Sequence, residues 1–168
     1  MRRRDPLADP TELARRVYAY AAYRLGPGPD AEDVTSETFE RALKYRNSYK
    51  SSQGTPVSWM LGIARRVIAD RAAQASETPI AETVEVADGG ELEQQSVTKL
   101  SLQSAMLQLT ERDRELLALR YGADLTAAQI AEVLGQRTNA VEVALHRALQ
   151  RLRGILDPQA ADEVDLAV

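Results

Sequence analysis

The side chains that could carry out chemistry in this sequence are arginines, aromatic rings and small polar groups. Arg65 and Arg66 follow Trp59 on a helical pattern, directly after the polar stretch NSYKSSQGT, which contains Tyr49. Arginines so placed can contact phosphates, and an unpaired base can stack on an aromatic ring or enter a pocket. The pattern is compatible with single-stranded DNA binding, although a solvated loop beside a surface helix is the simpler interpretation of these residues alone.

A second candidate surface lies in LTAAQIAEVLGQRTNAVEVALHRALQRLR, residues 125–153. Thr126 and Gln129 have the spacing of a capping box, Gly135 suits the left-handed end of a helix, and Thr138 is placed to cap the next helix. The pattern predicts a helix-turn-helix, whose second helix can enter a DNA major groove. Its buried stripe leaves these residues facing outward: Asn139, Glu142, Val143, His146, Arg147 and Gln150.

The residues that most enzymes need are missing. The chain has no cysteine and one histidine, so a thiolate or histidine metal site and a catalytic dyad are not expected. It has no phosphate-binding glycine loop, and its adjacent acidic pairs do not face each other on a helix. We therefore expect no enzyme, no cofactor and no metal. The start, MRRRDPLADP, lacks an apolar segment behind its arginines, and no run approaches the roughly 20 residues of a membrane span, so we expect a cytoplasmic protein.

Charge is unevenly distributed along the chain. The net charge is −4, which by itself argues against nucleic acid. Residues 1–72 nevertheless carry a net +4 and residues 99–153 a net +2, whereas residues 73–98 carry −6 and residues 154–168 carry −4. Two mildly basic segments are thus separated by an acidic connector and followed by an acidic tail. This distribution says more about possible partners than the net charge of the whole chain does.

Start and stop signals predict an all-α protein of two small helical domains. Asp9 and Thr55, each before a proline, should cap the first and third helices, Asp30 the second, and Thr110 a helix in the second half. Between the halves lies an acidic stretch with a proline and a Gly-Gly pair, which reads as a flexible linker. The expected divisions are a first domain over 1–75, a linker over 76–97, a helix-turn-helix domain over 98–156 and a tail over 157–168.

Three separated segments together resemble the extracytoplasmic-function sigma factors of bacterial RNA polymerase. AEDVTSETFERAL resembles the family's AED-x-x-Q-E-x-F helix, and SWMLGIARRVIADRAA resembles its W-L-x-x-I-A-R-N-x-x-x-D-x-x-R helix. LTERDRELLALRY and the helix-turn-helix resemble its C-terminal domain. The likeness covers roughly residues 13–156, with the three segments in the family's order.

This resemblance implies an alternative sigma factor that binds core polymerase, directs it to promoters and helps to melt the −10 region. The partners would be the β′ clamp helices, the β flap, promoter DNA and, in some members, an anti-sigma factor. The implied polymerase-binding residues are Asp33, Glu37, Phe39, Glu40, Arg41 and Lys44. The implied −10 residues are Ser48, Tyr49, Lys50, Ser51, Ser52, Gln53, Arg65 and Arg66, with Trp59 assigned to the core. The implied −35 residues are Arg137, Thr138, Asn139, Glu142, Val143, His146 and Arg147.

Several positions depart from the family pattern. Ser36 replaces a usual glutamine, and Arg66 stands where asparagine is common, next to the expected −10 pocket. In the recognition helix, Glu142 occupies a lysine position and Ala144 an arginine position. A carboxylate near a phosphate is repulsive, although it can accept from a cytosine amino group. We expect weak or unusual −35 recognition, and poor binding of promoter DNA by the free protein.

Two other classes of protein fit part of this sequence. LTERDRELLALRY before a helix-turn-helix also resembles the output domain of LuxR-type regulators, but this alternative leaves the two N-terminal segments unexplained. An interaction protein specialised for an anti-sigma partner would use the same surfaces, so the sequence does not separate it from a working sigma factor.

Overall fold

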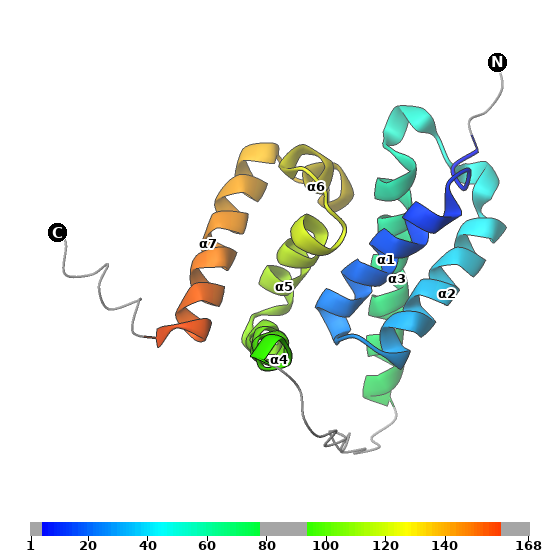
Figure 1. The fold of residues 1–168 in the computed structure, drawn as a ribbon. Helices are drawn as coiled ribbons and strands as arrows, with labels where there is room; N and C mark the ends of the chain where they lie inside the picture. The colour runs from blue at the N-terminus through cyan, green and yellow to red at the C-terminus, as the bar shows by residue number, and fades with distance from the viewer. Residues whose placement is uncertain (1–4, 78–93, 159–168) are drawn as a thin grey trace.

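The computed structural model of the chain describes residues 5–77 and 94–158. Its N-terminal half is a bundle of three helices, in which α1 and α3 both pack against α2 (Figure 1). The bounds are α1 (Pro10–Leu25), α2 (Pro29–Lys44) and α3 (Pro56–Glu77). Two short 3-10 turns, η1 (Arg46–Ser48) and η2 (Ser51–Gln53), form the connection between α2 and α3.

Local caps begin these helices mostly as predicted. The Asp9 carboxylate accepts from the backbone N–H of Glu12 at 3.1 Å, and Thr55 accepts from the N–H of Ser58 at 3.2 Å. The prediction that Asp30 caps α2 is wrong. Gly28 is the N-cap, with φ +128°, and Pro29 is the first helical residue. The fixed φ of proline suits the first helical position, so α2 begins earlier and Asp30 lies in its first turn.

The C-terminal half consists of four α-helices and one short π-helix, within the part of the chain that the structure describes. Their bounds are α4 (Gln94–Gln108), α5 (Glu111–Leu117), the π-helix η3 (Ala118–Gly122), α6 (Ala127–Leu134) and α7 (Thr138–Leu156). The range 76–97 was predicted as a linker, but α3 continues to Glu77 at its start and α4 begins at Gln94 near its end. Residues 78–93, and the tail beyond 158, lie outside the described residues.

The helix-turn-helix is formed by α6 and α7, and its turn chemistry is confirmed. Thr126 and Gln129 form the reciprocal capping box, and Gly135 ends α6 with φ +64°. The cap predicted for α7 is wrong. Arg137 is the extended N-cap residue, its side chain makes no capping bond, and Thr138 is already helical. The buried residues of α7 are Val141, Leu145 and Ala148.

A single buried cluster runs through both halves. In α3, Met60, Leu61, Ala64, Val67 and Ile68 are buried, and Ile63 is partly buried. The reason is that α3 packs on more than one side, against α1 and α2 and also against α6, so its buried face is wider than one helical stripe.

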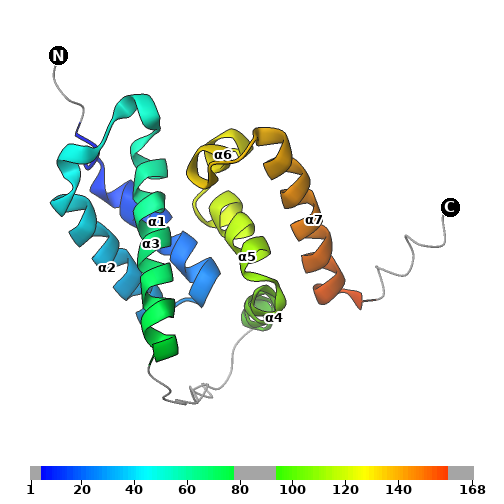
Figure 2. The ribbon, with the colours of Figure 1, turned by 180° about the vertical axis from the view of Figure 1, so that it is seen from behind.

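The two halves lie in direct contact. Figure 2 shows α6 beside α3, and η3 packs along α1. This contact joins residues about a hundred positions apart, and no local pattern predicts it. Among the described residues, no helix combines the length and the apolarity needed to cross a membrane.

Candidate nucleic-acid and polymerase surfaces

The candidate −35 residues share the outward face of α7 and its N-terminus. Side chains at 137, 139, 142, 143, 146 and 147 are exposed, and Thr138 is partly exposed. Val143, an apolar residue, is 51% exposed, which marks this side of the helix as unpacked. A shallow hollow beside Asn139, Val143 and Arg147 continues to Arg112 of α5. The face is therefore accessible and carries few positive charges, since Arg137 and Arg147 share it with the acidic Glu142.

Five of the candidate −10 residues line a cavity of about 270 Å³ between the α2–α3 connection, α3 and α6, namely Ser48, Tyr49, Lys50, Gln53 and Arg66, whereas Ser51, Ser52 and Arg65 do not line it. Tyr49 and Trp59 meet edge to face there, with ring centroids 5.5 Å apart. The Tyr49 hydroxyl donates to the carbonyl of Gly54 at 3.0 Å, which holds the connection against the helix. Trp59 is partly buried and also lines the cavity, so its role is only partly that of core. Exposed Arg66 and Lys50 also line the cavity, together with the carboxylate-bearing Glu132 of α6.

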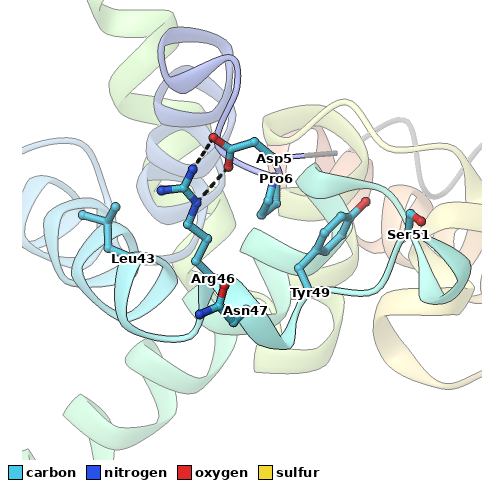
Figure 3. A pocket seen from close by; sticks show the side chains of 7 residues that line it. All are labelled: Asp5, Pro6, Leu43, Arg46, Asn47, Tyr49 and Ser51. Atoms are coloured by element: carbon cyan, nitrogen blue, oxygen red, sulfur yellow. Dashed lines mark hydrogen bonds and ion pairs between the residues drawn. The ribbon is translucent and has the colours of Figure 1, made fainter. Parts of the chain in front are cut away.

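A second hollow lies on the other side of Tyr49, between the connection and the N-terminal segment (Figure 3). Here Arg46 donates from Nε and Nη2 to the two carboxylate oxygens of Asp5, at 3.1 and 2.6 Å. The adjacent Pro6 is buried. This ion pair joins the chain before α1 to the start of the connection. It helps to position Tyr49 between the two hollows.

Arg65 lies apart from the other −10 candidates, because it is engaged by the C-terminal half. Its Nε donates to the Glu115 carboxylate at 2.6 Å, and its Nη1 donates to the carbonyl of Val133 at 3.2 Å. Arg66, the next residue, points to solvent. Successive residues on a helix are about 100° apart around its axis. Arg65 therefore faces the C-terminal half, whereas Arg66 faces the solvent beside the cavity.

Glu115 is the centre of this polar cluster between the halves. Besides Arg65, its carboxylate forms an ion pair with Nη1 of Arg24 at 3.1 Å and accepts from the Tyr20 hydroxyl at 3.3 Å. The Glu115 side chain is only 18% exposed. Burial raises the pKa of Tyr20 despite nearby Arg24, so the phenol stays protonated and donates.

The candidate polymerase-binding residues on α2 divide into two groups. Asp33, Glu37 and Arg41 take part in ion pairs with α3. Glu37 accepts from Arg41 at 2.6 Å and from Arg71 at 3.1 Å, and Arg41 also donates to Asp70 at 2.6 Å. Burial raises the pKa of Glu37, but the hydrogen bonds from the two arginines outweigh it and lower that pKa overall.

The other three residues of the group lie differently. Glu40 and Lys44 are exposed, and the Lys44 ammonium lies 5.5 Å from the centre of the Tyr45 ring. Phe39 is partly buried and packs against the core. The outer face of α2 therefore offers Glu40 and Lys44 to a partner, while Glu37 and Arg41 hold α2 against α3.

Sequence reasoning missed the residues through which the halves meet. Arg16 donates to the carbonyls of Ala123 and Asp124 at 2.7 and 2.8 Å, and Gly122 packs directly on the backbone of α1. The sequence shows a glycine followed by a polar turn at this position, but this pattern does not predict which helix packs against the glycine.

Two family descriptions match this chain. Sigma-70 region 2 matches residues 11–78, and Sigma-70 region 4 matches residues 99–152. The first range contains α1 to α3 with the pocket of Tyr49 and Trp59. The second contains most of α4 and the helix-turn-helix. The two matches therefore coincide with the two halves that carry the candidate surfaces.

Curated relatives agree with this division. The chain is 30% identical over 151 residues to the ECF RNA polymerase sigma factor BldN of Streptomyces coelicolor, covering 86% of this chain and 57% of that protein. It thus spans little more than half the length of BldN. It is 32% identical over 164 residues to the ECF RNA polymerase sigma factor SigD of Mycobacterium tuberculosis, covering 89% of this chain and 76% of SigD.

Solved structures share the fold. The sigma factor RpoE of Bartonella quintana, in complex with the anti-sigma factor NepR, superposes with a TM-score of 0.65 at 21% identity, over 86% of this chain and 91% of that one. CnrH, in complex with the cytosolic domain of CnrY, superposes with a TM-score of 0.59 at 21% identity, over 89% and 83% of the two chains. Both family matches, the curated relatives and the helix-turn-helix lead to one conclusion: the chain belongs to the extracytoplasmic-function sigma factors of the sigma-70 family.

Proposed function

We propose that this sigma factor contacts promoter DNA at two separate surfaces, the pocket of Tyr49 and Trp59 for the −10 element and the outward face of α7 for the −35 element. The observation that supports this most directly is the pocket, where two aromatic rings and Arg66 line one cavity. Its volume lies just below the roughly 300 Å³ at which pockets for small molecules begin, which suits a single base.

In the −10 contact, a base of the non-template strand leaves the duplex and enters this pocket. Unstacking one base costs a few kcal/mol, and stacking on an aromatic side chain returns about 1–3 kcal/mol. Arg66 and Lys50 are exposed beside the pocket and supply positive charge for the flanking phosphates. Because Arg66 replaces the asparagine that is common in the family, the preferred base need not be the usual one.

In the −35 contact, α7 lies in the major groove with Asn139, Glu142, Val143 and His146 toward the base edges. Arg137 and Arg147 contact phosphates or guanines from the two ends of the exposed face. Glu142 either repels a phosphate or accepts from a cytosine amino group. We propose that this contact is weak, so that the −10 contact carries more of the promoter specificity.

Core polymerase binding is assigned to both halves. The outer face of α2, with Glu40 and Lys44 at its centre, contacts the β′ clamp helices, and the C-terminal half contacts the β flap. Each DNA contact is small, and attachment to polymerase makes the two cooperate through their effective concentration. The protein then acts in the cytoplasm, where polymerase and chromosome are.

An anti-sigma factor is a further proposed partner. The solved relatives RpoE and CnrH are complexes with an anti-sigma factor and with the cytosolic domain of CnrY. A partner of this kind would compete for the polymerase and DNA surfaces described here.

Run-off transcription tests the proposal. Core polymerase with this chain, and with no other sigma factor, is expected to transcribe from a subset of a promoter library, and the selected sequences define both elements. Failure to transcribe from any member, together with failure to co-purify with core polymerase, would contradict the function. A regulator of the LuxR type would bind duplex DNA without polymerase, and the Sigma-70 region 2 match over residues 11–78 does not favour it.

A further inference from the structure

The hollow between the α2–α3 connection and the N-terminal segment lies directly beside the proposed −10 cavity (Figure 3). Tyr49 lines both of them, so the two meet at this side chain. The hollow has a volume of about 490 Å³, well above the roughly 300 Å³ at which pockets for small molecules begin. A DNA strand that places one base against Tyr49 and Trp59 therefore brings the adjacent nucleotide to this hollow.

Arg46 is the cation that lines this hollow, and its side chain is 50% exposed. Its Nε and Nη2 donate to the two carboxylate oxygens of Asp5 at 3.1 and 2.6 Å. A guanidinium carries five N–H groups in a planar fork, so this bidentate bond leaves the two N–H groups of Nη1 for another acceptor. Guanidinium groups make the same charge-assisted bonds with phosphate oxygens. Arg46 can therefore keep its bond to Asp5 and bind a phosphate at the same time.

Asp5 fixes the direction in which this guanidinium points. The same carboxylate accepts from the backbone N–H of Leu7 at 3.0 Å, and Pro6 between them is buried, so Asp5 is anchored to the N-terminal segment. The backbone of Arg46 is also held, because its carbonyl accepts from the N–H of Tyr49 at 3.4 Å. A free arginine loses rotamer freedom when it binds, whereas one that is already held has less to lose. Asp5 thus favours a phosphate contact through Arg46, although its own charge repels phosphate.

We propose that this hollow is a second contact for the −10 strand, in which Arg46 binds the backbone phosphate next to the flipped base and Asp5 is a positioning residue that aims Arg46. Pro6 and Leu43 line the hollow and give the sugar apolar walls to pack on. Neither Asp5 nor Arg46 belongs to the candidate −10 residues. The inference rests on the proposed function, in which the cavity of Tyr49 holds the flipped base.

The test uses the full chain and four substitutions. Arg46→Ala removes the proposed phosphate contact, and Asp5→Asn keeps the shape of the side chain but removes the charge that holds Arg46. The matched controls are Arg15→Ala and Glu12→Gln. Arg15 also donates from Nε and Nη2 to the two carboxylate oxygens of its partner, Glu12, at 2.9 and 2.7 Å, and neither residue lines the hollow or the cavity. Circular dichroism checks that each variant keeps its helices.

Binding of a fluorescent single-stranded oligonucleotide of mixed sequence is followed by anisotropy at several salt concentrations. Trp59 is the only tryptophan of the chain, so the quenching of its emission reports whether DNA fills the −10 cavity. A second oligonucleotide has the same sequence but methylphosphonate linkages, which carry no charge. Comparison of the two oligonucleotides separates a contact with phosphate from an indirect effect on the α2–α3 connection.

We expect Arg46→Ala to bind the charged oligonucleotide about fivefold more weakly than the unaltered chain, and Arg15→Ala to change the affinity less than about twofold. Arg46→Ala should also reduce the slope of log affinity against log salt by about 0.7, the value for one phosphate of a single strand. Asp5→Asn should bind about twofold more weakly although it removes a negative charge, whereas Glu12→Gln should not bind more weakly. With methylphosphonate linkages, Arg46→Ala and the unaltered chain should bind alike.

Three results would overturn the inference. Equal binding of the charged oligonucleotide by Arg46→Ala and Arg15→Ala would remove the phosphate contact. A loss in Arg46→Ala that persists with methylphosphonate linkages would show that Arg46 acts only through the fold of the connection. Binding by Asp5→Asn that is as tight as binding by Glu12→Gln would show that Asp5 does not aim Arg46.

Trp59 emission and run-off transcription with core polymerase separate this inference from the proposed function. If the unaltered chain supports transcription and DNA quenches Trp59, but Arg46→Ala behaves as Arg15→Ala, the second contact is wrong and the function stands. If Arg46→Ala weakens binding as expected, but Trp59 is not quenched and the chain supports no transcription, the phosphate contact stands and the proposed function fails.

Discussion

Arg151 of α7 holds a buried acid of α5, since its Nη1 lies 2.9 and 2.8 Å from the two carboxylate oxygens of Asp113. Asp113 is only 4% exposed, whereas Arg151 lies at the surface. The pair joins the recognition helix to the helix that precedes the helix-turn-helix. A buried carboxylate needs such a partner, because an unsatisfied charge in the interior is costly.

Removing this partner should destabilise the C-terminal half. In Arg151→Ala the Asp113 carboxylate loses both bonds and stays largely buried, which should lower the free energy of unfolding by about 1–3 kcal/mol. Urea denaturation followed by circular dichroism measures the change. Arg153→Ala, at an exposed position two residues along the same helix, is the control and should change stability little. Equal stability of the two variants would show that the Asp113 pair does not hold α5 against α7.

The ion-pair network between α2 and α3 should make stability depend on pH. The folded-state pKa of Glu37 is below its ordinary value, so the carboxylate stabilises the fold above the unfolded pKa of about 4.3 and loses this contribution as the pH falls through the lower folded value. We expect the urea midpoint to fall below about pH 4. Because the side chain is partly exposed, the contribution at neutral pH should stay below about 1 kcal/mol.

Glu37→Gln isolates this effect. The variant should be slightly less stable at pH 7 and should show a shallower loss of stability below about pH 4. Glu40→Gln, at an exposed site on the same helix, should keep the pH dependence of the unaltered chain. If both variants follow the same curve, the arginines do not stabilise ionised Glu37.

Arg66 should matter for opening the promoter more than for the first encounter with it. Because this arginine is exposed, Arg66→Ala should leave the fold intact, while open complexes at the −10 element fall several-fold through the loss of one phosphate contact. Permanganate reactivity of promoter thymines measures the opening. Arg15→Ala is the control, since Arg15 is an exposed arginine of α1 that bonds to Glu12 of the same helix. Equal opening by the two variants would remove Arg66 from the −10 surface.

Glu142 should weaken the −35 contact through its charge. Glu142→Lys replaces a repelled carboxylate by a phosphate-binding ammonium on the exposed face of α7, and should raise −35-dependent transcription several-fold. Run-off transcription from promoters with an intact and a scrambled −35 element measures this, and the scrambled promoter should respond less. A decrease on the intact promoter would instead identify Glu142 as a reader of cytosine.

Short-range features of this protein were predictable because the groups involved lie within one helical turn. The capping box of Thr126 and Gln129 and the cap from Asp9 to Glu12 each span three residues. The errors also have local causes. The N-cap of α2 is Gly28, two residues before the predicted Asp30, because proline at position 29 suits the first helical position. The N-cap of α7 is Arg137, one residue before the predicted Thr138, because the backbone of Arg137 is extended.

The sequence by itself determined the helices, the helix-turn-helix with its exposed face on α7, and membership of a two-part sigma factor family, because helical periodicity, caps and motif spacing are all written in neighbouring residues. Only the tertiary structure decided where Arg65 points. It bonds to Glu115, 50 residues away, and Arg16 bonds to Ala123, 107 residues away. Such partners are chosen by the packing of whole helices, here by the approach of η3 to α1 at Gly122, and a helical pattern shows only that a side chain faces outward.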